Sequence, residues 1–451
     1  MTNLVNLSSM RVVGHSLALS SLLLVACSSS PPPIMPKQQI LTPFGTHDTL
    51  NADDWQKEAL TVERAVTISL QNSPKVQQIL AEFDSDTVKN QQLSRWPELQ
   101  LSIARLASGD GSQLTSHLEL ALGKLLWQKN YRQLHDSRQQ QATSLAYQQL
   151  LLFAQQVRRS FYQYQICQAQ AATLQDIDKA AAALVTLATR QYQAGNINGR
   201  ERDQAMLAQA ETQLAVAANQ REQQQLRTEL NQLLGLRHDD TQWQVSAELP
   251  NLPVKLPSFN GNAVANFALK HHPSMIVATQ TLNAKQAQTN ISNKERWLPE
   301  STVGIEREKS SSEQAKVGGT FSVQLPFFAS QHRRLTQAET RMTQAWADNE
   351  RLNLHLQSRL AVQQWQSYWQ EARVWQDKLL PLHASIRQKT ALHYNGMLEG
   401  IEELIHSRQN ELDAQHRYLQ ALTQFALAQA QLEQWLTMPI NQAVNTLDVT
   451  P

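Results

Sequence analysis

The pattern of apolar and polar positions predicts that most of this chain folds into very long helices. Residues 128–193 contain no proline or glycine, so one uninterrupted helix of roughly 95 to 100 Å is expected at about 1.5 Å per residue. A returning helix is expected over residues 200–234, ended by the glycine that follows it. A second pair is expected over residues 331–394, kinked at Pro381, and over residues 401–436.

Short alternating runs predict two β-hairpins. Residues 98–107 and 113–123 alternate apolar with polar side chains on either side of Gly109-Asp110-Gly111, which has the chemistry of a turn. Residues 302–307 and 316–325 alternate in the same way. Successive side chains of a strand point to opposite faces of a sheet. The expected apolar face carries Leu101, Ile103, Leu118, Leu120, Val303, Ile305, Phe321 and Val323, and the expected polar face carries Gln100, Ser102, His117, Glu119, Glu306, Thr320 and Gln324.

The same ordered landmarks occur twice along the chain, about 200 residues apart. Asn72-Ser73-Pro74 returns as His271-His272-Pro273, in each case between short helical patterns. Arg95-Trp96-Pro97-Glu98, which precedes the first hairpin, returns at residues 296–300. Ordered repetition of tryptophan and proline landmarks indicates a gene duplication.

A third landmark is the turn between each long helix and its returning partner. Tyr192, Gly195 and Gly199 of the first turn return as Tyr394, Gly396 and Gly400, with both glycines offset by 201 residues. Each half is therefore expected to be one structural unit. The expected divisions are a first repeat over residues 58–248, a proline-rich connector over 249–258, a second repeat over 259–436 and a short tail over 437–451.

The first residues have the features of an export signal. A basic start is followed by an apolar stretch over residues 17–26, which is too short for a permanent membrane helix. Leu24-Val25-Ala26-Cys27 fits the site at which lipoprotein signals are cleaved. We expect a signal peptide over residues 1–26, starting at Met1 or Met10, and a lipidated tether over 27–57. The alternative is an ordinary secretory signal in which the cysteine is incidental.

Composition narrows the chemistry. The 40 basic and 39 acidic residues give no charge excess that would favour nucleic acid. The chain has two cysteines, so lipidation of Cys27 would leave Cys167 alone and no disulfide framework. The thirteen histidines, among them His406 and His416, form no dense metal-binding array. Nucleophile-elbow, phosphate-loop and dinucleotide patterns are absent, so we expect neither an enzyme nor a cofactor or bound metal.

Helices of this length must pack against one another along most of their length. Leu207 and Leu214, and Leu412 and Leu419, stand at the heptad spacing of such packing. Four two-faced strands cannot close a barrel alone, and exposed sheet edges are prone to aggregation. Strands from other copies would close it. A homotrimer would form a 12-stranded barrel with the apolar face toward lipid and the polar face toward a water-filled lumen.

The chain resembles the TolC family of outer-membrane efflux channels over residues 60–436. The individual motifs are short, but they occur in order, duplicated and behind a lipoprotein signal. They are Leu60-Thr61-Val62-Glu63-Arg64-Ala65-Val66, the Asn72 break and its repeat, the Trp-Pro step before each hairpin, Gln324-Leu325-Pro326-Phe327-Phe328 and the two Tyr/Gly turns.

This resemblance implies a mainly α fold with a β-barrel portion, assembled as a homotrimeric duct. A β-barrel would cross the outer membrane and an α-helical barrel would extend into the periplasm. The helical tips, at Tyr192, Gly195, Gly199, Tyr394, Gly396 and Gly400, would dock on a periplasmic adaptor coupled to an inner-membrane pump. The function implied is passive efflux.

The resemblance also implies a gate. In the family an acidic residue six positions beyond the glycine of the second turn helps to form the constriction. Glu402 occupies that position, with Glu403 beside it, and Glu201 and Asp203 occupy the matching region of the first half. The alternative is that these acids merely favour the N-terminal ends of the returning helices.

Two other functions stay open at the level of sequence. One is an outlet for type I protein secretion, and the other is a lipid-anchored coiled-coil protein without a pore. The alternating strands argue against the second. Drug, metal and protein cargo are alternatives, because a wide passive lumen selects little.

Overall fold

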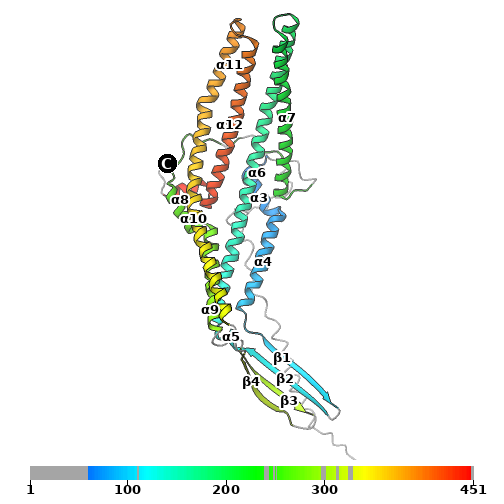
Figure 1. Ribbon diagram of the computed structural model, residues 1–451, viewed down its shortest axis with the longest axis vertical. Coiled ribbons are helices and arrows are strands. Elements are labelled where there is room, and N and C mark those ends of the chain that lie inside the picture. Colours follow the sequence, from blue (N-terminus) through cyan, green and yellow to red (C-terminus); the bar gives the residue numbers. More distant parts are fainter. Residues whose placement is uncertain are drawn as a thin grey trace, which may run out of the picture.

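The computed structural model describes residues 59–108, 111–237, 243–246, 249, 251–295, 301–310, 314–323 and 329–447. Two long helical hairpins lie side by side, and a four-stranded antiparallel sheet lies at the end opposite their tips (Figure 1). The mainly helical fold with four strands confirms the expected class. Cys27, the Trp landmark at 296–300, the turn at 109–110 and residues 324–328 lie outside the described residues.

The first half follows the expected order closely. Its elements are α3 (Val62–Asn72), α4 (Pro74–Ser94), β1 (Leu99–Ser108), β2 (Gly111–Ala121), α5 (Leu122–Leu126), α6 (Gln128–Gln193) and α7 (Gly199–Leu234). Ser73 separates α3 from α4: its hydroxyl accepts from the Lys75 N–H at 3.3 Å, and Pro74 occupies the first turn of α4. The short helix α5 was not expected, because residues 122 and 123 continue the alternation of β2.

The second half repeats this order. Its elements are α8 (Gly261–His271), α9 (Pro273–Glu295), β3 (Ser301–Ser310), β4 (Lys316–Val323), α10 (Ala329–Val374), η2 (Trp375–Leu379), α11 (Leu380–Asn395), α12 (Ile401–Leu436) and α13 (Ile440–Thr446). In place of a simple kink at Pro381, the π-helical turn η2 precedes it, since proline has no N–H to continue the ladder. The tail was expected to be short, and it contains α13.

The sheet has the order β1-β2-β3-β4. Leu101 pairs with Leu118, which in turn pairs with Ile305. Gln100 pairs with Glu119, and Glu119 pairs with Gly304. Directly paired residues point to the same face, so the described members of the expected apolar and polar sets lie on opposite faces. The two-faced pattern expected from the sequence is therefore confirmed by the strand register.

Each half has its own core where the short helices pack on the long ones. In the first half the core includes Leu150, Phe161 and Trp243, and in the second it includes Trp365 and Phe425. Residues before α3 also pair with residues after α7, because the Leu60 N–H donates to the Gln244 carbonyl at 2.7 Å. The ends of the first half are thereby tied together beside its core.

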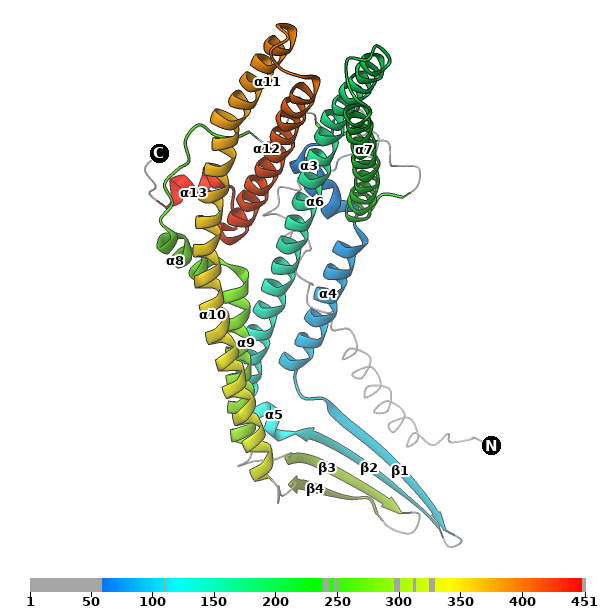
Figure 2. The same ribbon diagram turned by 45° about the horizontal axis from the view of Figure 1, so that its top comes forward.

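The long helices form one layer in the order α7, α6, α12 and α11, in which α12 packs against both α6 and α11 (Figure 2). Leu412 and Leu419 of α12 are buried inside this layer. Leu214 of α7 is 71% exposed and Ile386 of α11 is 53% exposed. The outer edges of the layer, α7 and α11, therefore present apolar side chains that are exposed among the described residues.

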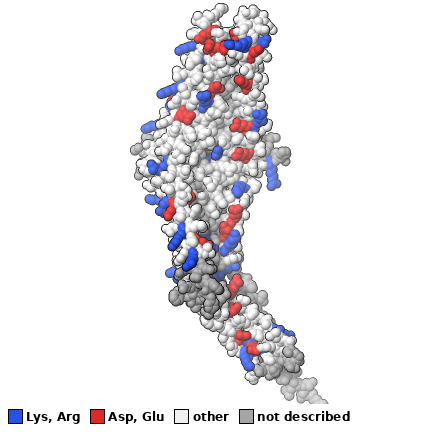
Figure 3. All heavy atoms as spheres, in the orientation of Figure 1, with Lys and Arg blue, Asp and Glu red and all other residues white. Residues whose placement is uncertain are grey.

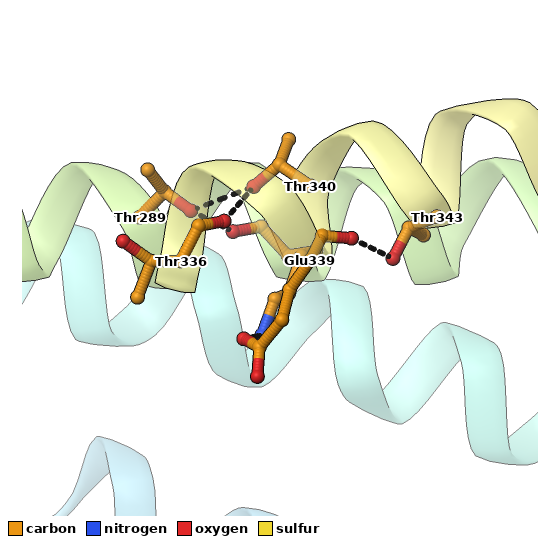
Figure 4. A network of polar contacts seen from close by, with 6 residues as sticks. Thr289, Thr336, Glu339, Thr340 and Thr343 are labelled. Atoms are coloured by element: carbon orange, nitrogen blue, oxygen red, sulfur yellow. Dashed lines mark hydrogen bonds and ion pairs between the residues drawn. The ribbon is translucent and has the colours of Figure 1, made fainter. Parts of the chain in front are cut away.

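A polar seam joins α9 to α10 in the section next to the sheet (Figure 4). Thr289 Oγ1 lies 3.0 Å from Thr340 Oγ1, and Thr340 Oγ1 donates to the Thr336 carbonyl at 2.8 Å. Lys285 forms an ion pair with Glu339. Because α9 leads into β3 and α10 follows β4, this seam fixes the two helices where they connect to the second hairpin.

His272 occupies the break between α8 and α9 and is 3% exposed. Its Nδ1 accepts from the Ser274 N–H at 3.3 Å, and its ring packs on Trp435 with centroids 5.1 Å apart. Burial lowers the pKa of His272 from 6.5 to about 4, because desolvation disfavours the imidazolium form.

His272 is expected to make the fold sensitive to acid. Below pH 6.5 the unfolded chain takes up this proton while the folded chain does not, so stability is full above pH 6.5 and declines as the pH falls toward 4. The loss at pH 5 is roughly 2 kcal/mol. His272→Gln should reduce the difference between the urea midpoints at pH 7 and pH 5. An unchanged difference would show that His272 is not its source.

Candidate functional site

The first tip lies between α6 and α7. The Gly195 N–H donates to the Tyr192 carbonyl at 3.0 Å, and the Asn196 N–H donates to the Gln191 carbonyl at 2.9 Å. Gly195 has a φ of +76°, in the left-handed region that glycine tolerates. Asn198 then caps α7, with Oδ1 accepting from the Glu201 N–H at 3.0 Å.

The second tip has the same pattern of backbone hydrogen bonds, but its glycines stand at other positions of that pattern. The Met397 N–H donates to the Tyr394 carbonyl at 3.0 Å, and the Leu398 N–H donates to the His393 carbonyl at 2.9 Å. Met397 therefore occupies the position of Gly195, and its φ is +56°. Gly400 is the N-cap of α12, with a φ of −82°.

Corresponding residues of the two turns are thus 202 positions apart, as Tyr192 and Tyr394 are. The expected pairing of their glycines, 201 positions apart, is wrong. Gly396, with a φ of −83°, matches Ala194, and Gly400 matches Asn198. Among the four turn glycines, only Gly195 has a positive φ.

The two tips touch each other. Gln191 Nε2 donates to the Tyr394 hydroxyl at 3.1 Å. Beneath this bond Ala188, Ala205 and Ile405 form a small buried cluster. The two hairpins are thereby joined within a few residues of their ends.

The candidate gate acids have different surroundings. Glu201 accepts from Asn198 Nδ2 at 2.8 Å, so it serves the cap of α7. Asp203 pairs with Arg202 at 2.7 Å, and the Arg202 guanidinium lies 4.5 Å from the centroid of the Tyr192 ring. Acidic and basic side chains gather near this end of the molecule (Figure 3).

The acids of the second half lie in the first turn of α12. Glu402 Oε1 is 3.8 Å from His406 Nε2, at the surface. With the offset of 202 residues, Glu403 rather than Glu402 is the counterpart of Glu201. Glu201, Glu402 and Glu403 all lie in the first turn of a returning helix, so the alternative explanation, a preference of acids for helix N-termini, fits all three.

An ion cluster below the second tip was not found from the sequence. Glu411 is 6% exposed, and its Oε2 lies 2.7 Å from Arg387 Nε and 2.5 Å from Arg408 Nη1. Arg387 and Glu411 are equidistant from the turn at 399. Antiparallel pairing about that turn was the signal that could have identified them.

The sheet provides a second candidate site. In the isolated chain Leu101 is 55%, Ile305 59% and Phe321 63% exposed. On the other face His117 Nε2 lies 2.9 Å from Thr320 Oγ1. This contact passes over Gly304, where an added Cβ would lie 2.9 Å from His117 Nε2 and 2.6 Å from the Leu118 carbonyl.

The described residues contain neither a candidate membrane-spanning helix nor a candidate metal-binding cluster. No helix in this part of the chain combines the length and the apolar character that a membrane crossing requires. Within the same ranges, histidine, cysteine and carboxylate side chains do not gather in groups of three that could hold a metal ion.

No protein-family model and no curated protein matches the sequence. Solved structures do match the fold. The Campylobacter jejuni CmeC outer membrane channel has a TM-score of 0.71 at 13% identity, with 93% of this chain and 98% of that chain covered. The Vibrio cholerae outer membrane protein VceC has a TM-score of 0.69 at 14% identity, covering 86% and 99%.

The open state of the Neisseria gonorrhoeae MtrE outer membrane channel has a TM-score of 0.66 at 14% identity, covering 84% of this chain and 89% of that chain. The similarity thus covers at least 89% of the length of each of these three neighbours. The chain has the fold of TolC-like outer membrane channels.

Proposed function

We propose that this protein is the outer-membrane duct of a tripartite efflux system. Substrate would be delivered by an inner-membrane pump through a periplasmic adaptor and would leave passively through the lumen. The observation that carries this proposal is the strand register, which sorts an exposed apolar face from a polar face. A sheet with those two faces suits a wall between lipid and water.

The edges of the sheet support assembly from several copies. In the described chain β1 and β4 are the edge strands, and pairing β1 of one copy with β4 of the next would satisfy both. Two copies would give eight strands, which leave an interior filled by side chains. Three copies would give twelve strands and a wider lumen, so we propose a homotrimer.

The helical layer supports the same assembly. Its edges α7 and α11 expose apolar side chains such as Leu214 and Ile386. Packing α7 of one copy against α11 of the next would bury both and close a helical barrel. The same neighbours would then meet along the sheet and along the helices.

We assign the periplasmic gate to the tips. Three copies would bring three Gln191–Tyr394 bonds and three Glu402 carboxylates near one axis, where a ring of carboxylates favours cations. Tyr192, Gly195, Gly199, Tyr394, Gly396 and Gly400 would meet the adaptor. Glu403, Glu201 and Asp203 would contribute charge around the constriction.

Conductance in planar bilayers tests this function. Tyr394→Phe removes a bond that is present three times, so the open probability should rise about tenfold or more. Tyr192→Phe keeps the ring beneath Arg202, so the open probability of this variant should stay near the wild-type value. Glu402→Gln should lower the preference for cations. The proposed function fails if the wild-type protein forms no channel. The gate assignment fails if Tyr394→Phe and Glu402→Gln both behave as wild type.

The anchor is a separate proposal, based on the Leu24-Val25-Ala26-Cys27 motif. We expect Cys27 to carry lipid that holds the chain at the outer membrane. Cys27→Ser should abolish incorporation of labelled fatty acid and leave an uncleaved precursor, while Cys167→Ser should retain both labelling and cleavage. Equal labelling of wild type and Cys27→Ser would contradict the anchor.

A further inference from the structure

Charged side chains in strands β1–β4 are sorted by face. Glu119, Glu306 and Glu308 all lie on the polar face, where Glu308 pairs with Lys316 of β4. Three cations lie instead on the apolar face, and all three are exposed. They are Arg105, Arg307 and Lys309.

These cations are confined to one end of the apolar face. Arg105 and Lys309 both pair with Leu114, so they flank one leucine in a single row across the sheet. Arg307 lies in the adjacent row, between Ser116 and Val317. The next rows toward the helices are uncharged: Leu101, Leu118, Ile305 and Gly319, then Leu99, Leu120, Val303 and Phe321.

The spacing suits one shared ligand. Alternate strands are about 10 Å apart, and alternate residues of one strand are about 7 Å apart. Long arginine and lysine side chains can converge across such distances. Because Leu114 and Val317 adjoin them on the same face, these cations lie within the apolar surface rather than beyond its end.

Their height in the membrane selects one leaflet. From Leu99 to Arg105 the strand rises about 20 Å, or about 15 Å along the membrane normal at the usual tilt of barrel strands. The cations therefore lie in the half of the wall farthest from the helices, which is the outer leaflet in the proposed duct. A lipid-facing cation is costly there unless an anion meets it.

We propose that Arg105, Arg307 and Lys309 bind the phosphate group of an acyl lipid in the outer leaflet, with its acyl chains on the uncharged rows below. Arginine offers paired N–H donors that match phosphate oxygens, and lysine adds a point charge. The proposal rests on the duct function, because it places the sheet in the outer membrane.

Lipid retention by the assembled full-length protein provides the test. The purified protein is incubated in detergent with bisphosphorylated lipid A or with the same lipid after enzymatic dephosphorylation, then washed and analysed by native mass spectrometry. Wild type should retain the phosphorylated lipid at least tenfold better than the dephosphorylated one. This comparison needs no variant, so it does not depend on whether a mutant assembles.

Variants then locate the site. Combined Arg105→Gln, Arg307→Gln and Lys309→Gln should lower retention at least tenfold, while Lys316→Gln, at the same end of the polar face, should match wild type. Equal retention by the triple variant, or equal retention of both lipids by wild type, would overturn the proposal. Conductance in phosphatidylcholine bilayers is measured in parallel: a conducting triple variant that retains lipid refutes the lipid site alone, whereas a non-conducting wild type refutes the duct.

Discussion

Leu101→Arg is expected to abolish recovery of assembled protein from the outer membrane. Leu101 lies on the exposed apolar face, in the row that contains Leu118 and Ile305. An arginine facing lipid costs up to about 2 to 4 kcal/mol per chain, the value at the bilayer midplane, or up to roughly 6 to 12 kcal/mol in a trimer. Heat-modified electrophoresis of isolated outer membranes measures the outcome, because an unboiled assembly migrates differently from the monomer.

Ser102→Arg is the matched control for this prediction. Ser102 is the next residue of the same strand and pairs with His117 on the polar face. The same arginine would there face water, so trimer recovery near the wild-type level is expected. Similar recovery of the two variants would mean that the faces of the sheet are assigned incorrectly.

Gly235→Ala is expected to destabilise the first half by about 2 to 5 kcal/mol. Gly235 ends α7 with a φ of +72°, which costs a residue with a Cβ about 1 to 2 kcal/mol. A Cβ would also lie 2.5 Å from the Asn72 carbonyl oxygen, so the junction of α3 and α4 must shift at a further cost of about 1 to 3 kcal/mol. Urea denaturation followed by circular dichroism measures the loss.

The second half supplies the control for this glycine. Thr437 follows α12 with a φ of +55°, and its side chain is already accommodated there. Thr437→Ala should therefore shift the urea midpoint far less than Gly235→Ala. A comparable loss in both variants would attribute the effect to the helix ends in general and not to the contact with Asn72.

The extent of the long helices was predictable because proline and glycine mark where a helix ends. Proline and glycine are absent from residues 128–193, and α6 spans Gln128–Gln193. The strand faces were predictable for a similar reason, since alternation alone assigns each side chain to a face. The repeat boundaries and the roles of the tip residues stay predictions.

The turn register was not predictable from residue identity. Gly396 and Gly400 resemble Gly195 and Gly199 in the sequence. The backbone hydrogen bonds nevertheless show that Met397, and not Gly396, is the structural counterpart of Gly195. Tertiary pairings such as Arg387 with Glu411 depend on how two helices meet across a turn. The π-helical turn before Pro381 is a local adjustment of the ladder that apolar periodicity does not record.

The difference between Gly195 and Met397 has a consequence for stoichiometry. In the proposed homotrimer six hairpin ends would form one ring, alternating between a compact glycine end and an end that projects Met397, which is 94% exposed. A partner that recognises only what the ends share, a tyrosine and a reversed chain, would find six sites. A partner that contacts the methionine would find three. The ring would therefore present pseudo-sixfold symmetry to the first partner and strict threefold symmetry to the second.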